Sequence, residues 1–125
     1  QTCSSIGYYG DWLVAHEVAH QWYGDNISPK SFHHIWLNEG FATYYAHLYD
    51  GHKNGRDSMR WGLYQDARRI LTAEDSPRAI VNRIYKRPLS QFDYRSYKKG
   101  GWVLHMLRTD LGEPLYVSST RRTSR

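Results

Sequence analysis

The pentapeptide HEVAH at residues 16–20 carries the residue types of a metal site. His16 and His20 are four positions apart and lie on one face of an α-helix, since a turn takes about 3.6 residues, so both imidazoles can reach one ion. Glu17 is rotated off that line and is free to contact a water molecule instead of the ion. Two packed core histidines would give the same pattern, so its meaning depends on a third ligand further along the chain.

Glu39, in the sequence WLNEGFATYY, is the candidate third ligand. It follows His20 after 18 intervening residues, and its side of a predicted helix also carries Thr43 and Ala46, which are small enough to let two helices approach closely. A solvated glutamate near a helix start, favoured by the helix dipole, is the alternative interpretation. Two imidazoles and one carboxylate with an open fourth position are typical of a catalytic zinc site, so we expect one Zn²⁺ ion.

The other histidines do not extend this set. A competing zinc pattern needs a glycine three residues and a histidine six residues after the second histidine, but Tyr23 and Asn26 occupy those positions. Three further histidines fit no ligand spacing with one another or with Glu39, and we expect them at the surface or at a rim: His33, His34 and His47. His105 is expected to pack within a helix.

The elements that must position these residues are predicted to be helices. Apolar periodicity predicts them over residues 12–23, 36–50, 57–71 and 96–111. The first is expected to begin after an N-cap at Asp11 and to bury Val14, Val18 and Trp22 on the side opposite its histidines. Little of the chain alternates with a period of two, so any sheet would be a minor feature near residues 80–85. The fold class is therefore predicted to be mainly α.

Composition and charge narrow the function classes. A chain of 125 residues, 40% hydrophobic and 15% aromatic, is typical of one globular domain. The net charge of +5 comes from basic residues interleaved with acidic ones, without a nucleic-acid-binding motif, so we expect no nucleic-acid partner. No apolar run approaches the length of a membrane span, so we expect no membrane segment in this chain. The single cysteine, Cys3, cannot form an internal disulfide.

Three motifs in order resemble one family. HEVAHQWYGD (16–25) followed by WLNEGFATYY (36–45) resembles the M1 family of zinc aminopeptidases, which are gluzincins related to the thermolysin-like catalytic domain. The gap between the second histidine and the glutamate matches that family. The segment YKKGGWVLHML (97–107) is similar to the family's Tyr-x-Lys-Gly segment, which opens a helix. The resemblance covers roughly residues 1–112 and implies a helical, thermolysin-like zinc-peptidase domain.

The resemblance implies a role for each of five residues. It makes His16, His20 and Glu39 the zinc ligands, Glu17 the general base, and Tyr97 the donor of a hydrogen bond to the oxyanion. These roles agree with elementary chemistry, because zinc lowers the pKa of a bound water to about 7 and a positioned base can move the water's proton to the leaving amine. A phenol can stabilise the tetrahedral oxyanion. The implied reaction removes N-terminal residues from a peptide substrate.

The sequence departs from the family at both ends. The family's Gly-x-Met-Glu-Asn-like strand, whose glutamate holds the substrate's amino group, and the β-rich N-terminal domain of the parent protein do not precede Gln1. Residues 113–125 are expected to be disordered or to form a tail outside the family. We therefore interpret residues 1–112 as a partial catalytic core. A catalytically silent zinc-binding fragment and a thermolysin-type endopeptidase, which needs no amine anchor, remain as alternatives.

Overall fold

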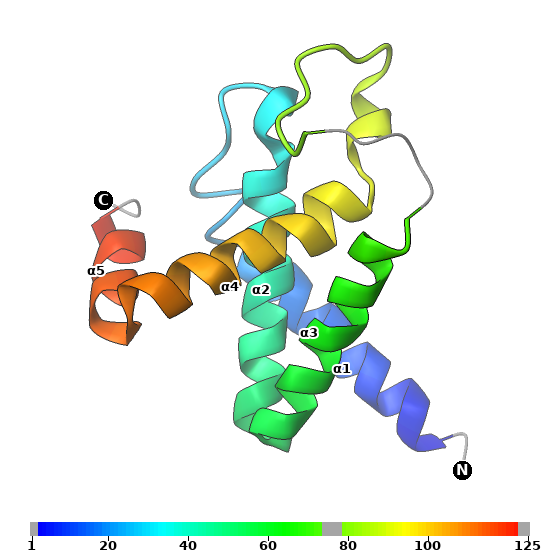
Figure 1. The fold of residues 1–125 in the computed structure, drawn as a ribbon, viewed down its shortest axis with the longest axis vertical. Helices are drawn as coiled ribbons and strands as arrows, with labels where there is room; N and C mark the ends of the chain where they lie inside the picture. The colour runs from blue at the N-terminus through cyan, green and yellow to red at the C-terminus, as the bar shows by residue number, and fades with distance from the viewer. Residues whose placement is uncertain (1–2, 74–78, 123–125) are drawn as a thin grey trace.

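The computed structural model describes residues 3–73 and 79–122, with side chains described for residues 10–73 and 79–118. Five α-helices follow one another in these ranges (Figure 1): α1 (Cys3–His20), α2 (Ile35–Asn54), α3 (Arg56–Leu71), α4 (Gly100–Leu111) and α5 (Glu113–Arg122). Three short helical segments complete them: η1 (Phe32–His34), η2 (Pro88–Gln91) and the π-helix η3 (Arg95–Lys99). The mainly α fold class is confirmed. The described residues contain no β-strand, including at 80–85, and no described helix is long and apolar enough to cross a membrane.

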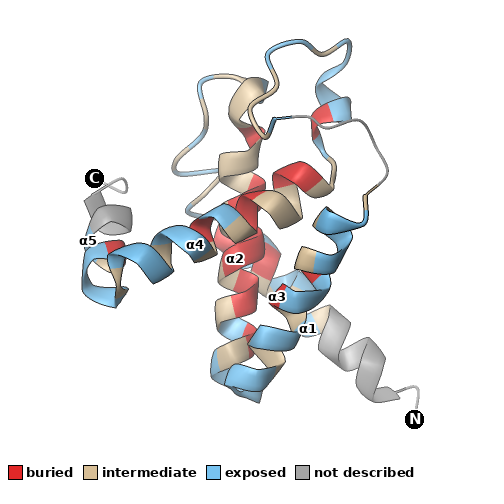
Figure 2. Cartoon of the chain, viewed as in Figure 1, coloured by how far each residue is buried: buried red, intermediate tan, exposed pale blue. Residues whose placement is uncertain are grey.

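Helix α2 is the central element of the fold. It packs against α1, α3, α4 and η3, and Figure 2 shows buried residues along most of its length. Ala42 and Ala46 are fully buried and keep the surrounding helices close to its backbone. The apolar core gathers around Tyr44 of α2, which packs with Leu104 of α4 and Tyr116 of α5.

Helix α1 differs from its prediction in both its start and its buried face. It begins at Cys3, so Asp11 is no N-cap but lies in the helix interior and forms an ion pair with Lys53 of α2. The predicted apolar back is wrong, because Val14, Val18 and Trp22 are 62%, 51% and 54% exposed. The histidine face packs towards α2 instead. Apolar residues lie on more than one face of α1, so periodicity alone could not indicate which face would be covered.

The other helices follow the predictions more closely, except at the C-terminal end. α3 and the end of α4 at Gly112 agree with the predicted ranges, whereas α2 continues through Gly51 and ends before Gly55. Residues 113–122, expected to be disordered, form α5. Its Tyr116 is only 2% exposed and meets the ring of Tyr44 edge-on at 6.2 Å, so one buried aromatic side chain anchors this segment to the core.

Candidate metal centre

The side chains of His16, His20 and Glu39 converge where α1 packs against α2. The Nε2 atoms of the two histidines are 3.1 Å apart, and Oε2 of Glu39 is 3.4 Å from each of them. The candidate ligand atoms all lie within 4.8 Å of one another. His16 and Glu39 are 4% and 6% exposed. The structure thus brings together the three candidate ligands that the sequence indicated, in an arrangement that could hold one metal ion.

One buried polar atom of this cluster fits the presence of a cation. Oε2 of Glu39 is buried 3.4 Å from Nε2 of each histidine and accepts no hydrogen bond from any described residue. A buried carboxylate oxygen without a donor is costly in free energy unless a cation lies beside it. Two imidazole nitrogens and a carboxylate oxygen form a donor set suited to a divalent transition metal.

The imidazole of His20 is oriented by a backbone contact. Its Nδ1 donates a hydrogen bond to the carbonyl oxygen of Tyr23 at 2.9 Å, and a carbonyl can only accept, so the Nε2 lone pair of neutral His20 faces the cluster. Gly24 makes this turn possible, with φ at 143°, and a Cβ there would lie 3.2 Å from Nδ1 of His20. The ring of Tyr23 stacks on Phe41 of α2 at 4.1 Å. The hydrogen bond between His20 and the Tyr23 carbonyl was not predicted from the sequence, in which Gly24 is its only indication.

The charges within the cluster reinforce one another. The close contact with the Glu39 carboxylate raises the pKa of His20 to about 9, against the opposing effect of burial. Burial by itself would raise the pKa of Glu39, but the close contacts with His16 and His20 outweigh it and lower that pKa to about 2. The carboxylate is therefore ionised at neutral pH. A metal that binds here must displace the proton from His20, so its uptake releases protons.

The two candidate catalytic residues lie beside the ligands. The ring of Tyr97 stacks on the ring of His16, with centroids 5.9 Å apart and planes at 19°. Burial, followed by the negative charges of Glu39 and Glu17, raises the pKa of Tyr97 to about 12, so the phenol keeps its proton at neutral pH. Glu17 is exposed, and its carboxylate is near enough to raise the pKa of His20 as well. All five residues singled out from the sequence therefore gather in one place.

A pair of glycines brings Tyr97 to the site across a long stretch of sequence. Tyr97 lies in the π-helix η3, directly before α4, and Gly100 at the start of α4 crosses Gly40 of α2. A Cβ on Gly40 would lie 2.9 Å from the carbonyl carbon of Gly100, and a Cβ on Gly100 would lie 3.1 Å from Cα of Gly40. Gly40 directly follows the candidate ligand Glu39, so this close backbone crossing brings the phenol to the candidate ligands.

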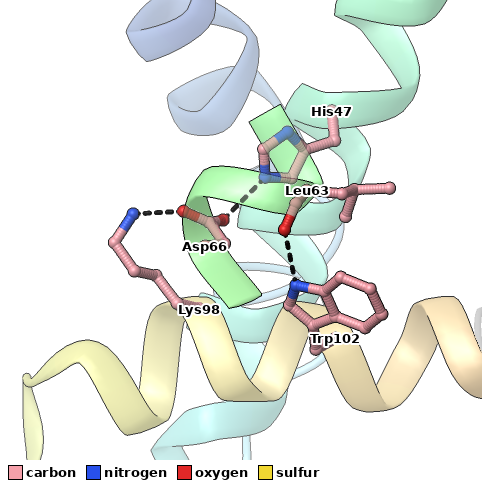
Figure 3. A network of polar contacts seen from close by, with 5 residues as sticks. All are labelled: His47, Leu63, Asp66, Lys98 and Trp102. Atoms are coloured by element: carbon pink, nitrogen blue, oxygen red, sulfur yellow. Dashed lines mark hydrogen bonds and ion pairs between the residues drawn. The ribbon is translucent and has the colours of Figure 1, made fainter. Parts of the chain in front are cut away.

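One expectation about the remaining histidines is wrong. His47 is not at the surface or a rim but is 5% exposed, and its Nε2 lies 2.8 Å from Oδ2 of Asp66 on α3. Figure 3 shows that Lys98 of η3 pairs with the other oxygen of Asp66. Gly62 makes room for the His47 ring, since a Cβ there would lie 2.9 Å from two of its atoms. A histidine that pairs with a residue 19 positions away gave no signal in the sequence.

Comparisons with known proteins identify the family. The model of the peptidase family M1 domain matches residues 10–121, and the chain belongs to this family. It is 39% identical over 107 residues to aminopeptidase N of Haemonchus contortus and 37% identical over 114 residues to aminopeptidase 2 of Candida albicans. These alignments cover 81% and 84% of this chain. No solved structure gives a significant match.

The matches also define how much of the relatives the chain represents. It spans 11% of the length of the Haemonchus protein, 12% of the Candida protein, and 13% of aminopeptidase M1 of Arabidopsis thaliana, to which it is 32% identical over 117 residues. The family match extends to residue 121 and so includes most of α5. The sequence motifs indicate the family only as far as about residue 112, because no motif marks the later residues.

Proposed function

We propose that this chain is the zinc-binding part of an aminopeptidase, which removes N-terminal residues from peptides. The convergence of His16, His20 and Glu39 supports it most directly, because two imidazoles and one carboxylate leave a coordination position open for chemistry. The relatives described above are aminopeptidases, which supports the choice of a free N-terminus as the point of attack.

The chain's own residues supply the proton transfers of such a reaction. Zinc, when bound, would supply Lewis-acid polarisation and an activated water near neutral pH. Glu17 is exposed beside the ligands and would accept the proton of the attacking water and deliver it to the leaving amine. Tyr97 would donate a hydrogen bond to the substrate's carbonyl oxygen as negative charge builds on it. The stacking of Tyr97 on the ring of His16 supports this role, since it places the phenol beside the candidate ligands.

Hydrolysis of amino-acid arylamides tests the proposal. The purified chain, and any longer protein that contains it, is assayed with zinc, after chelation, and after zinc is restored. We expect cleavage of arylamides with a free amino group, lost on chelation and recovered with zinc. N-blocked peptides serve as the comparison substrate.

The outcomes separate the alternatives. Preferential cleavage of N-blocked peptides would indicate an endopeptidase of thermolysin type. Stoichiometric zinc without cleavage of either substrate would indicate a catalytically silent zinc-binding chain. Failure to bind zinc at all would contradict the proposed metal centre.

A further inference from the structure

A buried polar network lies beside the proposed active site and has no part in the mechanism described above (Figure 3). It joins His47 of α2, Asp66 of α3 and Lys98 of η3. The side chains of His47 and Asp66 are 6% and 7% exposed, and that of Lys98 is 40% exposed. A carboxylate only accepts hydrogen bonds, so Nε2 of His47 donates to Oδ2 of Asp66 while Lys98 donates to Oδ1.

We propose that this network positions Tyr97 for the reaction, an inference that rests on the proposed function. Lys98 directly follows Tyr97, and both lie in a π-helix, a rare conformation that depends on its surroundings for support. Asp66 holds Lys98 from a neighbouring helix, and His47 holds Asp66 in turn. The ion pair between Lys98 and Asp66 therefore fixes the orientation of the π-helical turn and, with it, the direction of the Tyr97 phenol.

Ring contacts connect the same network to the metal ligands. The ring of Trp12 lies edge-on to His47 at 5.9 Å and stacks on the ligand His16 at 5.5 Å. His16 stacks in turn on Tyr97. Tyr97 is thus constrained in two ways: its ring stacks on the ring of His16, and its backbone continues into Lys98, which pairs with Asp66. Loss of the second support would move the phenol relative to the ligands, and a displacement of about 1 Å can cost about a hundredfold in rate.

A purely structural role for the ion pair makes a different prediction. Removal of Asp66 would leave two donors without their acceptor and could unfold the chain, so a loss of activity in that variant alone would not show positioning. Lys98→Met is milder, because Lys98 is 40% exposed and Asp66 keeps its hydrogen bond to His47. Positioning predicts that the effect of Lys98→Met depends on the Tyr97 hydroxyl, whereas a stability effect does not.

A double-mutant cycle on the zinc-loaded protein tests this dependence. We expect Lys98→Met to lower kcat by about tenfold or more, with KM and zinc content unchanged, and Lys98→Arg to restore part of the loss. In a Tyr97→Phe background, Lys98→Met should lower kcat by less than about twofold, because no hydroxyl remains to be misplaced. Lys53→Met is the matched control. Lys53 lies near the C-terminal end of α2, and its ion pair with Asp11 of α1 is exposed.

Two kinetic outcomes would overturn the inference. One is an unchanged kcat in Lys98→Met. The other is a loss of the same size with and without the Tyr97 hydroxyl, which would mean that the network acts elsewhere.

An NMR measurement tests the geometry without any turnover. Tyrosine ring carbons are labelled, and the Tyr97 signal is identified by its absence from the Tyr97→Phe spectrum. Lys98→Met should shift this signal, and Lys53→Met should leave it in place. An unshifted Tyr97 signal in Lys98→Met overturns the inference whatever the activity. If wild-type protein cleaves no arylamide, the proposed function fails, while an unshifted Tyr97 signal in Lys98→Met would still overturn the inference about Lys98.

Discussion

The C-terminal end of α1, residues 16–20, separates two tasks between neighbouring side chains. His16 and His20 face α2, where Nε2 of each lies 3.4 Å from Glu39, and His20 is oriented from behind by the carbonyl of Tyr23. Glu17 is rotated away from that line and stays exposed, although its charge reaches His20. The proposed ligands and the proposed base can therefore be altered one at a time.

Removal of one ligand should abolish metal binding. In His20→Ala only one imidazole and one carboxylate remain, so we expect the variant to lose stoichiometric zinc, as measured by elemental analysis after dialysis. His52→Ala, which removes an exposed histidine of α2 outside the cluster, should retain it. Undiminished zinc in His20→Ala would contradict the ligand assignment.

Neutralisation of the proposed base should separate binding from turnover. Glu17→Gln keeps the shape of the side chain and all three ligands, so zinc content should be unchanged while kcat for arylamides falls by about a hundredfold or more. Zinc content and kcat are measured on the same preparation. Loss of zinc from this variant would mean that the roles of Glu17 and Glu39 are exchanged.

At the scale of elements, the site depends on how closely α2 approaches the start of α4. The backbones cross at Gly40 and Gly100, one residue after a ligand and three residues after Tyr97. Helix-interior glycines are unfavourable by about 1 kcal/mol relative to alanine, so each weakens its helix locally. The close packing of α2 against α4 offsets that cost. Only glycine at both positions leaves room for this packing.

Alanine at the crossing should therefore destabilise the protein. Gly40→Ala would place a Cβ 2.9 Å from backbone of Gly100, which cannot move aside as a flexible side chain would. We expect the free energy of unfolding to fall by about 1–3 kcal/mol in urea titrations, despite the better helix propensity of alanine. Gly10→Ala is the control, because its Cβ would meet nothing within 4 Å and should stabilise α1 by up to about 1 kcal/mol. Equal effects at the two positions would contradict the steric argument.

At the scale of the whole molecule, polar contacts hold much of the interior together. The apolar core around Tyr44 is small, while buried polar side chains line α2 and its neighbours, among them Glu39, His47 and Asp66. These groups stabilise the fold only when their partners and charges are in place. Metal and pH should therefore change global stability, as well as the site.

Zinc should stabilise the folded chain. A ligand that binds only the native state adds about 2.7 kcal/mol to the free energy of unfolding when its free concentration is about a hundred times its Kd. We expect zinc to raise the midpoint of urea unfolding, and chelation to reverse the change. The midpoint of His20→Ala should not respond to zinc; a response equal to that of the wild type would show that the metal binds elsewhere.

Acid should destabilise the fold in part through Asp66. Burial by itself would raise the pKa of Asp66, but hydrogen bonds from His47 and Lys98 outweigh it and hold that pKa below its ordinary 3.8. A carboxyl with a lower pKa in the folded than in the unfolded chain stabilises the fold above its ordinary pKa. This contribution is lost as the pH falls through the folded pKa.

Urea titrations from about pH 5 to about pH 2 measure this effect in the metal-free chain. The free energy of unfolding should fall less steeply with acid in Asp66→Asn than in the wild type. Glu39 contributes equally to both proteins, so the difference reports Asp66. Parallel curves would contradict the prediction.

The sequence by itself determined the features that depend on local spacing. Two histidines four positions apart share a helix face wherever that helix is placed, and the end of α4 at Gly112 follows from apolar periodicity and one glycine. The length and type of α3 were predictable for the same reason. The motif around Glu39 indicated the third ligand because its helix presents small residues beside it.

Tertiary structure decided what depends on contacts between distant residues. Which face of α1 is buried depends on what packs against it, so Val14 and Val18 are exposed although their periodicity favoured burial. α5 forms because Tyr116 reaches a core built by other helices. His47 is buried because Asp66, from another helix, supplies its partner. The phenol of Tyr97 meets the ligands only through the crossing of two glycines 60 positions apart, a proximity that no local pattern encodes.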